Sequence, residues 1–125
     1  MERPIRITAG TVRLDAQLND TETGKAVWEA LPITAPAGTW GDEIYFGIPV
    51  AMDLEAGQEV VELGDLGYWP PGQAFCIFFG LTPASRGEEI RPASAVTVIG
   101  KVHGDVAALR QVRAGTPVVI EQARQ

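Results

Sequence analysis

The N-terminal part of the chain alternates apolar and polar residues with a period of two. Ile5 and Ile7 alternate with polar neighbours, and after Ala9-Gly10 the same pattern continues over residues 12–18. Such alternation places one face of a strand against a core and the other face in water. Because the Ala9-Gly10 pair is a turn signal between the two runs, we predict an antiparallel hairpin over residues 5–18.

The period changes after residue 18. The apolar residues between 26 and 31 fall on one helical stripe, and Asp20 can cap the start of such a helix. Pro32 cannot continue a helix and disfavours helical geometry at Leu31. We therefore predict one short amphipathic helix that is capped by Asp20 and ends at Leu31.

Most of the remaining chain consists of short apolar segments separated by Gly and Pro. The predicted strands cover residues 33–34, 43–48, 59–63, 67–69, 75–79, 96–102 and 118–120, with a second helix between Asp105 and Gly115. Residues 75–79 are apolar on both faces, so a helix or loop must cover the outer side of that strand. This pattern predicts a mainly β fold, a closed barrel of about eight antiparallel strands with two short helices capping its ends.

Size and composition restrict the function classes. The 125 residues fit a single domain that spans 1–125. The net charge is −6 and the basic residues are scattered, which argues against a nucleic-acid partner. Without a membrane-length apolar run or a signal-peptide pattern, we expect no membrane contact and a cytoplasmic location. One cysteine, Cys76, and one histidine, His103, cannot form a zinc site, and we expect no metal and no cofactor.

Several segments resemble a known family when they are taken in order. These segments are residues 40–46 (WGDEIYF), 64–72 (GDLGYWPPG), 76–80 (CIFFG), 98–106 (VIGKVHGDV) and 117–120 (PVVI). The last two are similar to the C-terminal strand, helix and strand of cyclophilins. The first three resemble a family of compact bacterial and archaeal cyclophilin-like proteins of unknown function. The resemblance covers nearly the whole chain and implies a small cyclophilin-type barrel with shortened loops.

The resemblance also implies a difference in chemistry. Cyclophilins carry a Phe-His-Arg segment whose arginine polarises the prolyl amide and so weakens its C–N double-bond character. The segment that matches by order is residues 44–48 (IYFGI), which contains neither His nor Arg. Arg86 and Arg91 lie in a later loop, from which they could reach a groove. Efficient prolyl isomerase activity is therefore not expected, and no catalytic residue is assigned.

Aromatic residues and one carboxylate form the candidate ligand-binding set. The set consists of Trp40, Glu43, Tyr45, Tyr68, Trp69 and Phe78. The rings either line a ligand pocket or fill the barrel mouth and the space beneath the helices. Glu43 opens a predicted strand, and an inward-facing carboxyl group there would have a raised pKa and a functional role. Asp42 and Asp65 each follow a glycine, which is typical of turn caps.

The sequence leaves three functional hypotheses. The leading one is a binding module for a small molecule or an extended peptide. The alternative is a weak or divergent peptidyl-prolyl isomerase, and a third is an interaction or oligomer subunit. We expect the chain to be a monomer or a homodimer. We expect Cys76 to be an inert buried thiol, because a Cys–His pair with His103 would need adjacent strands and a common face.

Overall fold

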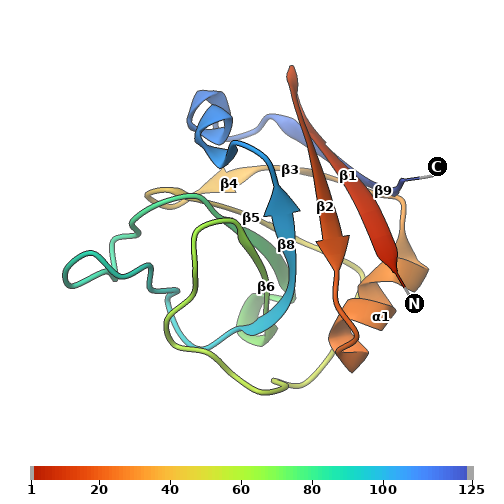
Figure 1. Cartoon of the computed structure of the whole chain (residues 1–125), viewed down its shortest axis with the longest axis horizontal. Coiled ribbons are helices and arrows are strands. Elements are labelled where there is room, and N and C mark those ends of the chain that lie inside the picture. Colours follow the sequence, from red (N-terminus) through yellow and green to blue (C-terminus); the bar gives the residue numbers. More distant parts are fainter. Residues whose placement is uncertain (1, 124–125) are drawn as a thin grey trace.

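The computed structural model describes residues 2–123, and its strands form one antiparallel sheet (Figure 1). The strands are β1 (Arg3–Ala9), β2 (Val12–Leu18), β3 (Ile33–Pro36), β4 (Gly38–Thr39), β5 (Glu43–Gly47), β6 (Asp65–Trp69), β7 (Ala74–Phe78), β8 (Thr97–His103) and β9 (Pro117–Gln122). Their spatial order is β3-β9-β1-β2-β8-β6-β7-β5-β4. The mainly β architecture is confirmed, with nine strands in place of about eight.

The predicted N-terminal hairpin is confirmed. β1 pairs with β2 from Arg3↔Leu18 to Ala9↔Val12, and alternate residues along both strands are buried. The apolar residues of the alternation point into the barrel, while their polar neighbours face outward. The period-two pattern therefore set both the type and the register of this element.

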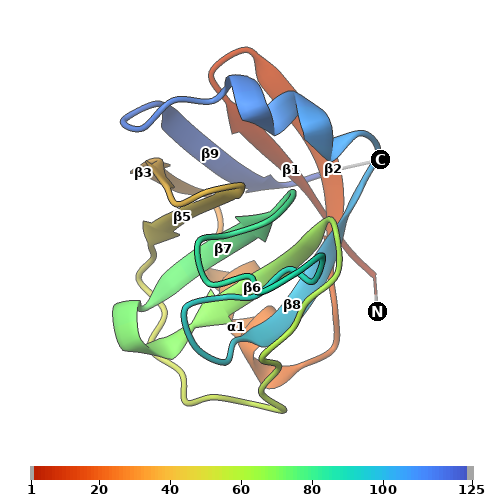
Figure 2. The same cartoon turned by 90° about the vertical axis from the view of Figure 1, so that its left-hand side faces the viewer.

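The two ends of the sheet are joined through a single residue. β3 pairs with β9 at one end of the strand order, and β4 pairs with β5 at the other. Only Ala37 separates β3 from β4, and β3 also contacts β5. One bent segment, residues 33–39, therefore closes the sheet into the barrel seen in Figures 1 and 2.

The strand predicted over residues 59–63 is wrong. This stretch makes isolated bridges only, Gln58↔Val96 and Val61↔Ile90. Val60 and Leu63 are 43% and 56% exposed, so the apolar residues here do not form a buried face. The segment runs along the outside of the barrel, where Val61 is its one buried residue and the Glu62 carboxylate pairs with Lys101 at 2.9 Å.

Both predicted helices are present, with corrected details. Helix α1 (Glu22–Ala30) is capped by Thr21, whose hydroxyl accepts a hydrogen bond from Gly24 N at 2.9 Å. The prediction that Asp20 is the cap is wrong, because its carboxylate pairs with Arg3 at 2.6 Å. The second helix, η2 (Val106–Gln111), is a 3₁₀ helix. The two helices lie at opposite ends of the barrel (Figures 1 and 2). Neither of them, nor any other helix within residues 2–123, has the length and apolar character needed to cross a bilayer.

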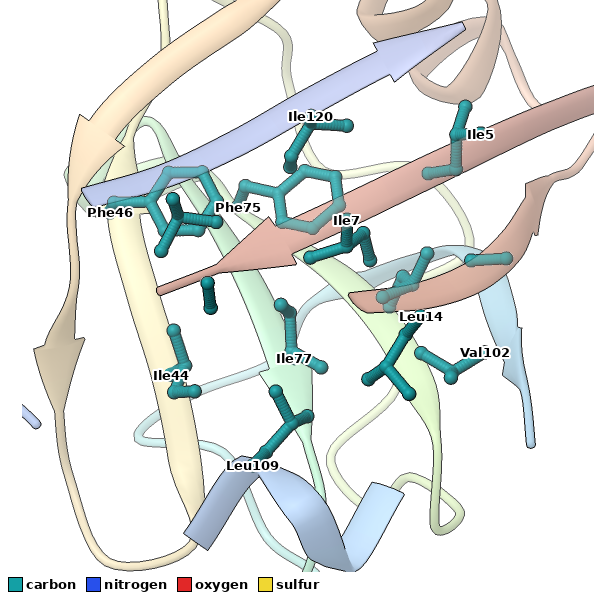
Figure 3. Close-up of a cluster of buried hydrophobic side chains, with 14 of the residues drawn as sticks. Ile5, Ile7, Leu14, Ile44, Phe46, Phe75, Ile77, Val102, Leu109 and Ile120 are labelled. Atoms are coloured by element: carbon teal, nitrogen blue, oxygen red, sulfur yellow. The ribbon is translucent and has the colours of Figure 1, made fainter. Parts of the chain in front are cut away.

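The buried side chains form two clusters on opposite sides of the β5–β7–β6 part of the sheet. The larger cluster fills the barrel and includes Phe46 and Phe75, whose rings stack with centroids 5.4 Å apart (Figure 3). The smaller cluster consists of Val61, Ala74, Cys76, Phe78, Ile90 and Val96. Every residue of β7 is buried because the interior covers one face of this strand and loops cover the other. The expected cover over the outer face is thus confirmed as a loop.

Candidate functional site

A cavity of about 280 Å³ lies on the outer face of the sheet, beside the smaller cluster. Its lining residues are Trp40, Glu43, Tyr45, Trp69, Cys76, Pro92, Ala93 and Val96. β5, β6 and β7 supply the sheet side. The chain between β7 and β8 passes in front of β6 and β7 (Figure 2) and supplies Pro92, Ala93 and Val96. The cavity is therefore formed between a rigid sheet and a loop.

Strand alternation decides which side chains reach this cavity. In β5, Ile44 and Phe46 point into the barrel, so Glu43 and Tyr45 must point outward. Tyr45 lies directly opposite Cys76 of β7 in the antiparallel register. The small Cys76 side chain consequently forms part of the wall between larger neighbours.

Two glycines allow the aromatic rings to lie against the backbone. Gly38 pairs with Tyr45, and a Cβ at Gly38 would come within 2.6 Å of the Tyr45 ring atom Cζ. A Cβ at Gly72 would come within 2.9 Å of the Trp69 ring. The Trp69 indole Nε1 also donates a hydrogen bond to Ser94 Oγ at 2.7 Å, which ties the ring to the loop. Tyr45 and Trp69 are therefore held in place at the edge of the cavity.

The covering loop has its own hydrogen-bond network. The Glu89 carboxylate accepts hydrogen bonds from Arg86 N at 2.9 Å, Gly87 N at 2.8 Å and Arg91 Nε at 3.1 Å. These bonds lower the pKa of Glu89 to about 2, with the Arg86 backbone amide the largest cause. Thr82 Oγ1 donates a hydrogen bond to Arg91 O across the base of the loop. This network fixes the chain just before Pro92 and Ala93.

Glu43 is the one buried carboxyl group of the cavity. It is only 6% exposed, and its Oε1 atom has no hydrogen-bond partner among the described residues. Burial raises the pKa of Glu43 to about 7. The neighbouring Cys76 thiol acts in the opposite direction and lowers the pKa of Glu43, but burial is the larger cause. The Cys76 Sγ lies 3.9 Å from Ala74 O, toward which it donates. Burial, followed by the nearby Glu43 charge, raises the pKa of Cys76 well above its usual value. The thiol is thus buried, as we expected.

The structure brings together four of the six predicted site residues: Trp40, Glu43, Tyr45 and Trp69 all line the cavity. Tyr68 instead faces the barrel interior, fully buried, with its hydroxyl donating to Val50 O at 2.6 Å. Phe78 is fully buried in the smaller cluster and does not line the cavity. For these two rings the structure favours the packing interpretation.

Sequence reasoning missed the contribution of the loop. Pro92, Ala93 and Val96 carry no chemical signal in the sequence, and only the folding of the loop onto the sheet brings them to the site. Arg91 is held by Glu89 and does not line the cavity, and neither does Arg86. No basic side chain is among the described residues that line it.

The other acidic groups have structural partners. Asp65 caps its turn as predicted, accepting a hydrogen bond from Glu62 N at 2.8 Å. Asp42 lies 3.6 Å from Arg110 Nη2, with no turn-capping bond from its side chain. Within residues 2–123, no three His, Cys, Asp or Glu side chains come close enough together to hold a metal ion. Cys76 and His103 lie on β7 and β8, which are separated by β6.

A second, larger hollow of about 660 Å³ has Tyr68 among its lining residues and lies next to the start of α1. Its polar lining residues are Glu22, Asp53, Glu55, Tyr68 and Gln73. The Glu55 carboxylate accepts hydrogen bonds from Glu22 N, Thr23 N and Thr23 Oγ1, each at 3.0 Å. Glu55 therefore caps α1 from a distant loop, and its hydrogen-bonding capacity is used within the fold. The smaller cavity is the better candidate, because its carboxyl group has an unused oxygen atom.

Comparison with known proteins agrees with this architecture. The chain superposes on the solution structure of a hypothetical protein from Archaeoglobus fulgidus with a TM-score of 0.83 and 44% sequence identity. The match covers 98% of this chain and 95% of the other. No curated protein matches the sequence. The Cyclophilin-like family model matches residues 3–121. The chain therefore belongs to the Cyclophilin-like family.

Proposed function

We propose that this cyclophilin-like protein is a binding module and that the cavity beneath the loop is its ligand site. The observation that carries the proposal is the combination, in one cavity, of three aromatic side chains with a buried carboxyl oxygen that lacks a partner. An unsatisfied buried acceptor destabilises a fold, and a ligand that donates a hydrogen bond would remove that penalty. Apolar walls with a few polar groups are typical of ligand sites.

The size of the cavity limits what it can hold. At about 280 Å³ it lies just below the usual range of small-molecule pockets, roughly 300–1,000 Å³. It can accept a small ligand or one side chain of a longer one. Both forms of the hypothesis, a small molecule and an extended peptide, therefore use the same cavity.

The indole N–H signals of the tryptophans can test the proposal by two-dimensional NMR. Trp40 and Trp69 line the cavity, whereas Trp28 packs against the barrel core from α1 and serves as an internal control. Titration with small aromatic and aliphatic fragments is expected to shift the Trp40 and Trp69 signals and to leave Trp28 unchanged. Fragments that shift all three signals equally, or none, would contradict the proposal.

A cavity-filling variant provides the matched control. Ala93→Phe places a ring in the cavity and is expected to abolish the fragment-induced shifts. Ala107→Phe, at an exposed alanine of η2 outside the cavity, is expected to leave them intact. If Ala93→Phe binds the fragments as well as the unmodified protein does, they bind elsewhere.

A weak or divergent prolyl isomerase is the alternative function. Family membership favours this alternative. The position of the cavity also favours it, because β5 matches the catalytic segment of cyclophilins by sequence order. The cavity offers a carboxyl group in place of an arginine. A protease-coupled assay on a proline-containing peptide is expected to show no acceleration over the spontaneous rate. A catalysed rate that Ala93→Phe removes would instead support the isomerase.

A further inference from the structure

The chemistry of the cavity walls restricts the class of ligand beyond the general proposal above, on which this inference rests. The walls combine aromatic side chains of Trp40, Tyr45 and Trp69 with the carboxyl group of Glu43. Aromatic π-systems attract cations, and Trp is the strongest attractor among them. An ionised carboxylate in the same space adds a second attraction for a cation.

The charges around the site also favour a cationic ligand. No Lys or Arg is among the described residues that line the cavity, and the whole chain carries a net charge of −6. A negative protein field attracts cationic ligands and repels anionic ones. A carboxylate or phosphate ligand would meet Glu43 without a compensating positive group.

The unpartnered oxygen distinguishes between kinds of cation. Glu43 Oε1 is buried and accepts no hydrogen bond from the described residues. An ammonium group with N–H donors can donate a hydrogen bond to this acceptor, whereas a quaternary ammonium group has no N–H to donate. We infer that the cavity binds a primary or secondary organic ammonium ion, whose N–H group bonds to Glu43 and whose apolar substituent lies among Trp40, Tyr45 and Trp69.

Glu43 must be ionised to bind a cation strongly, and its surroundings make this dependent on pH. The other titratable groups that line the cavity are Cys76 from β7 and Tyr45 from β5, and the loop contributes only uncharged residues there. Asp42, the chain neighbour of Glu43, pairs with Arg110. Burial raises the pKa of Glu43 to about 7, so the empty site is largely protonated in mild acid. Ammonium binding should therefore strengthen as pH rises through neutrality.

Three benzyl compounds of similar size test the inference: benzylammonium, the neutral benzyl alcohol and the anionic benzoate. Affinities are measured at about pH 8 from the indole N–H shifts of Trp40 and Trp69. Benzylammonium is expected to bind at least about tenfold more tightly than benzyl alcohol, and benzoate not to bind. Glu43→Gln, a near-isosteric variant, is expected to bring benzylammonium down to the affinity of benzyl alcohol. The benzyl alcohol affinity should stay the same in this variant.

The pH dependence of the unmodified protein provides a second readout that needs no variant. Between about pH 5.5 and pH 8 the benzylammonium affinity is expected to rise by roughly tenfold, with no comparable rise for benzyl alcohol. If a protonated Glu43 donated to a neutral ligand instead, affinity for such a ligand would fall over the same range. That opposite slope would overturn the ammonium inference.

The outcomes separate the inference from the proposed function. If benzyl alcohol binds as tightly as benzylammonium and Ala93→Phe blocks both, the cavity is a ligand site but the ammonium assignment is wrong. If none of the three compounds shifts Trp40 or Trp69 while other fragments do, the ammonium inference fails and the proposed ligand site stands. If no fragment of any kind shifts these signals, the small-molecule form of the proposed function fails as well. Benzylammonium binding that survives Glu43→Gln unchanged also overturns the inference.

Discussion

At the scale of single residues, Glu43 is a carboxyl group whose charge depends strongly on the fold. The carboxyl group is 6% exposed, lies beside the Cys76 thiol and has an oxygen atom without a hydrogen-bond partner. Burial without a positive partner favours the protonated form, which raises the pKa of Glu43 to about 7 from its ordinary value of 4.5. A buried carboxyl group of this kind links the stability of the protein to pH.

Stability is expected to fall as pH rises from about 4.5 to 7 because of Glu43. Below this window the group is protonated in both the folded and unfolded states. Within it, the unfolded chain releases the proton while the folded chain retains it, so rising pH favours unfolding. Above pH 7 both states are ionised and the penalty stays constant. Glu43→Gln removes the ionisation, so its stability relative to the unmodified protein should increase by on the order of 1–3 kcal/mol across this window.

Urea denaturation at a series of pH values measures this effect. Glu59→Gln is the matched control, because Glu59 is an exposed loop residue and its variant should track the pH profile of the unmodified protein. If Glu43→Gln keeps the profile of the unmodified protein, then Glu43 ionises normally in the fold and the interpretation of its environment is wrong.

At the scale of elements, side-chain hydrogen bonds to the backbone decide where the short segments begin and how they bend. Thr21 caps α1 through its hydroxyl, and Glu55 reaches the same helix start from a distant loop. Glu89 performs a comparable role within the loop over the cavity by accepting two backbone N–H bonds. The Thr21 and Glu89 bonds are local, whereas Glu55 is more than 30 residues from the helix start that it caps, and local propensity does not supply such a partner.

Removal of the Thr21 cap is expected to destabilise the protein. Thr21→Ala leaves the Gly24 N–H without its acceptor, which should lower the free energy of unfolding by about 1 kcal/mol. Thr21→Ser retains an acceptor and should recover most of that loss. Thermal unfolding followed by circular dichroism measures both variants. Equal stability of the Ala and Ser variants would show that the hydroxyl does not cap the helix.

The loop over the cavity is expected to loosen when Glu89 loses its charge. Glu89→Gln weakens the bonds to the Arg86 and Gly87 amides and the pairing with Arg91, so trypsin should cleave after Arg86 faster than in the unmodified protein. Glu88→Gln, at the exposed neighbouring position, is the control and should be cleaved at the original rate. Mass spectrometry of timed digests measures the two rates. Identical rates for the two variants would mean that Glu89 does not restrain the loop.

At the scale of the whole molecule, one barrel core is sealed from both ends. Val27 from α1 and Leu109 from η2 are both fully buried in the same cluster that contains Phe46 and Phe75 (Figure 3 shows Leu109 below Ile44 and Ile77). The bent segment at Ala37 closes the sheet, so a single core connects most strands. Truncation of a helix residue that enters this core should therefore weaken the whole barrel.

Leu109→Ala is expected to lower the free energy of unfolding by about 2–5 kcal/mol, since it removes a fully buried side chain and leaves a cavity. Leu81→Ala is the control, because Leu81 is 48% exposed and its truncation should change stability by less than about 0.5 kcal/mol. Urea unfolding followed by tryptophan fluorescence and by circular dichroism should give coincident transitions. A loss confined to η2, with the barrel transition unchanged, would show that the helix is not part of the common core.

Much of the fold was predictable because its signals are local. Three elements follow from the spacing of residues along the chain. They are the hairpin with its alternation over residues 5–18, the helix with its apolar stripe before Pro32, and β7, which is apolar on both faces. The errors arose where tertiary contacts decide which residue caps a helix or whether a segment forms a strand. Thr21 displaced Asp20 as the cap because Arg3, from another strand, binds the Asp20 carboxylate. Residues 59–63 looked like a strand, yet within the described residues this stretch makes one isolated bridge, Val61↔Ile90.

The candidate site was also predictable only in part. The sequence singled out four aromatic or acidic residues that line the cavity: Trp40, Glu43, Tyr45 and Trp69. It also singled out Tyr68 and Phe78, which are buried packing residues. Tyr68 lies on the strand face that enters the barrel, and Phe78 packs within the smaller cluster instead of lining the cavity. The loop residues Pro92 and Ala93 carry no signal of their own.

By itself, the sequence determined that the chain forms a β-barrel with one helix after the first two strands and one before the last strand. The reason is that the spacing of apolar residues and the turn residues act locally. Only the tertiary structure decided that the loop after β7 folds over the sheet and buries Glu43 between aromatic side chains. The physical reason is that burial and an unsatisfied acceptor depend on which distant segments meet. Spacing along the chain cannot reveal this.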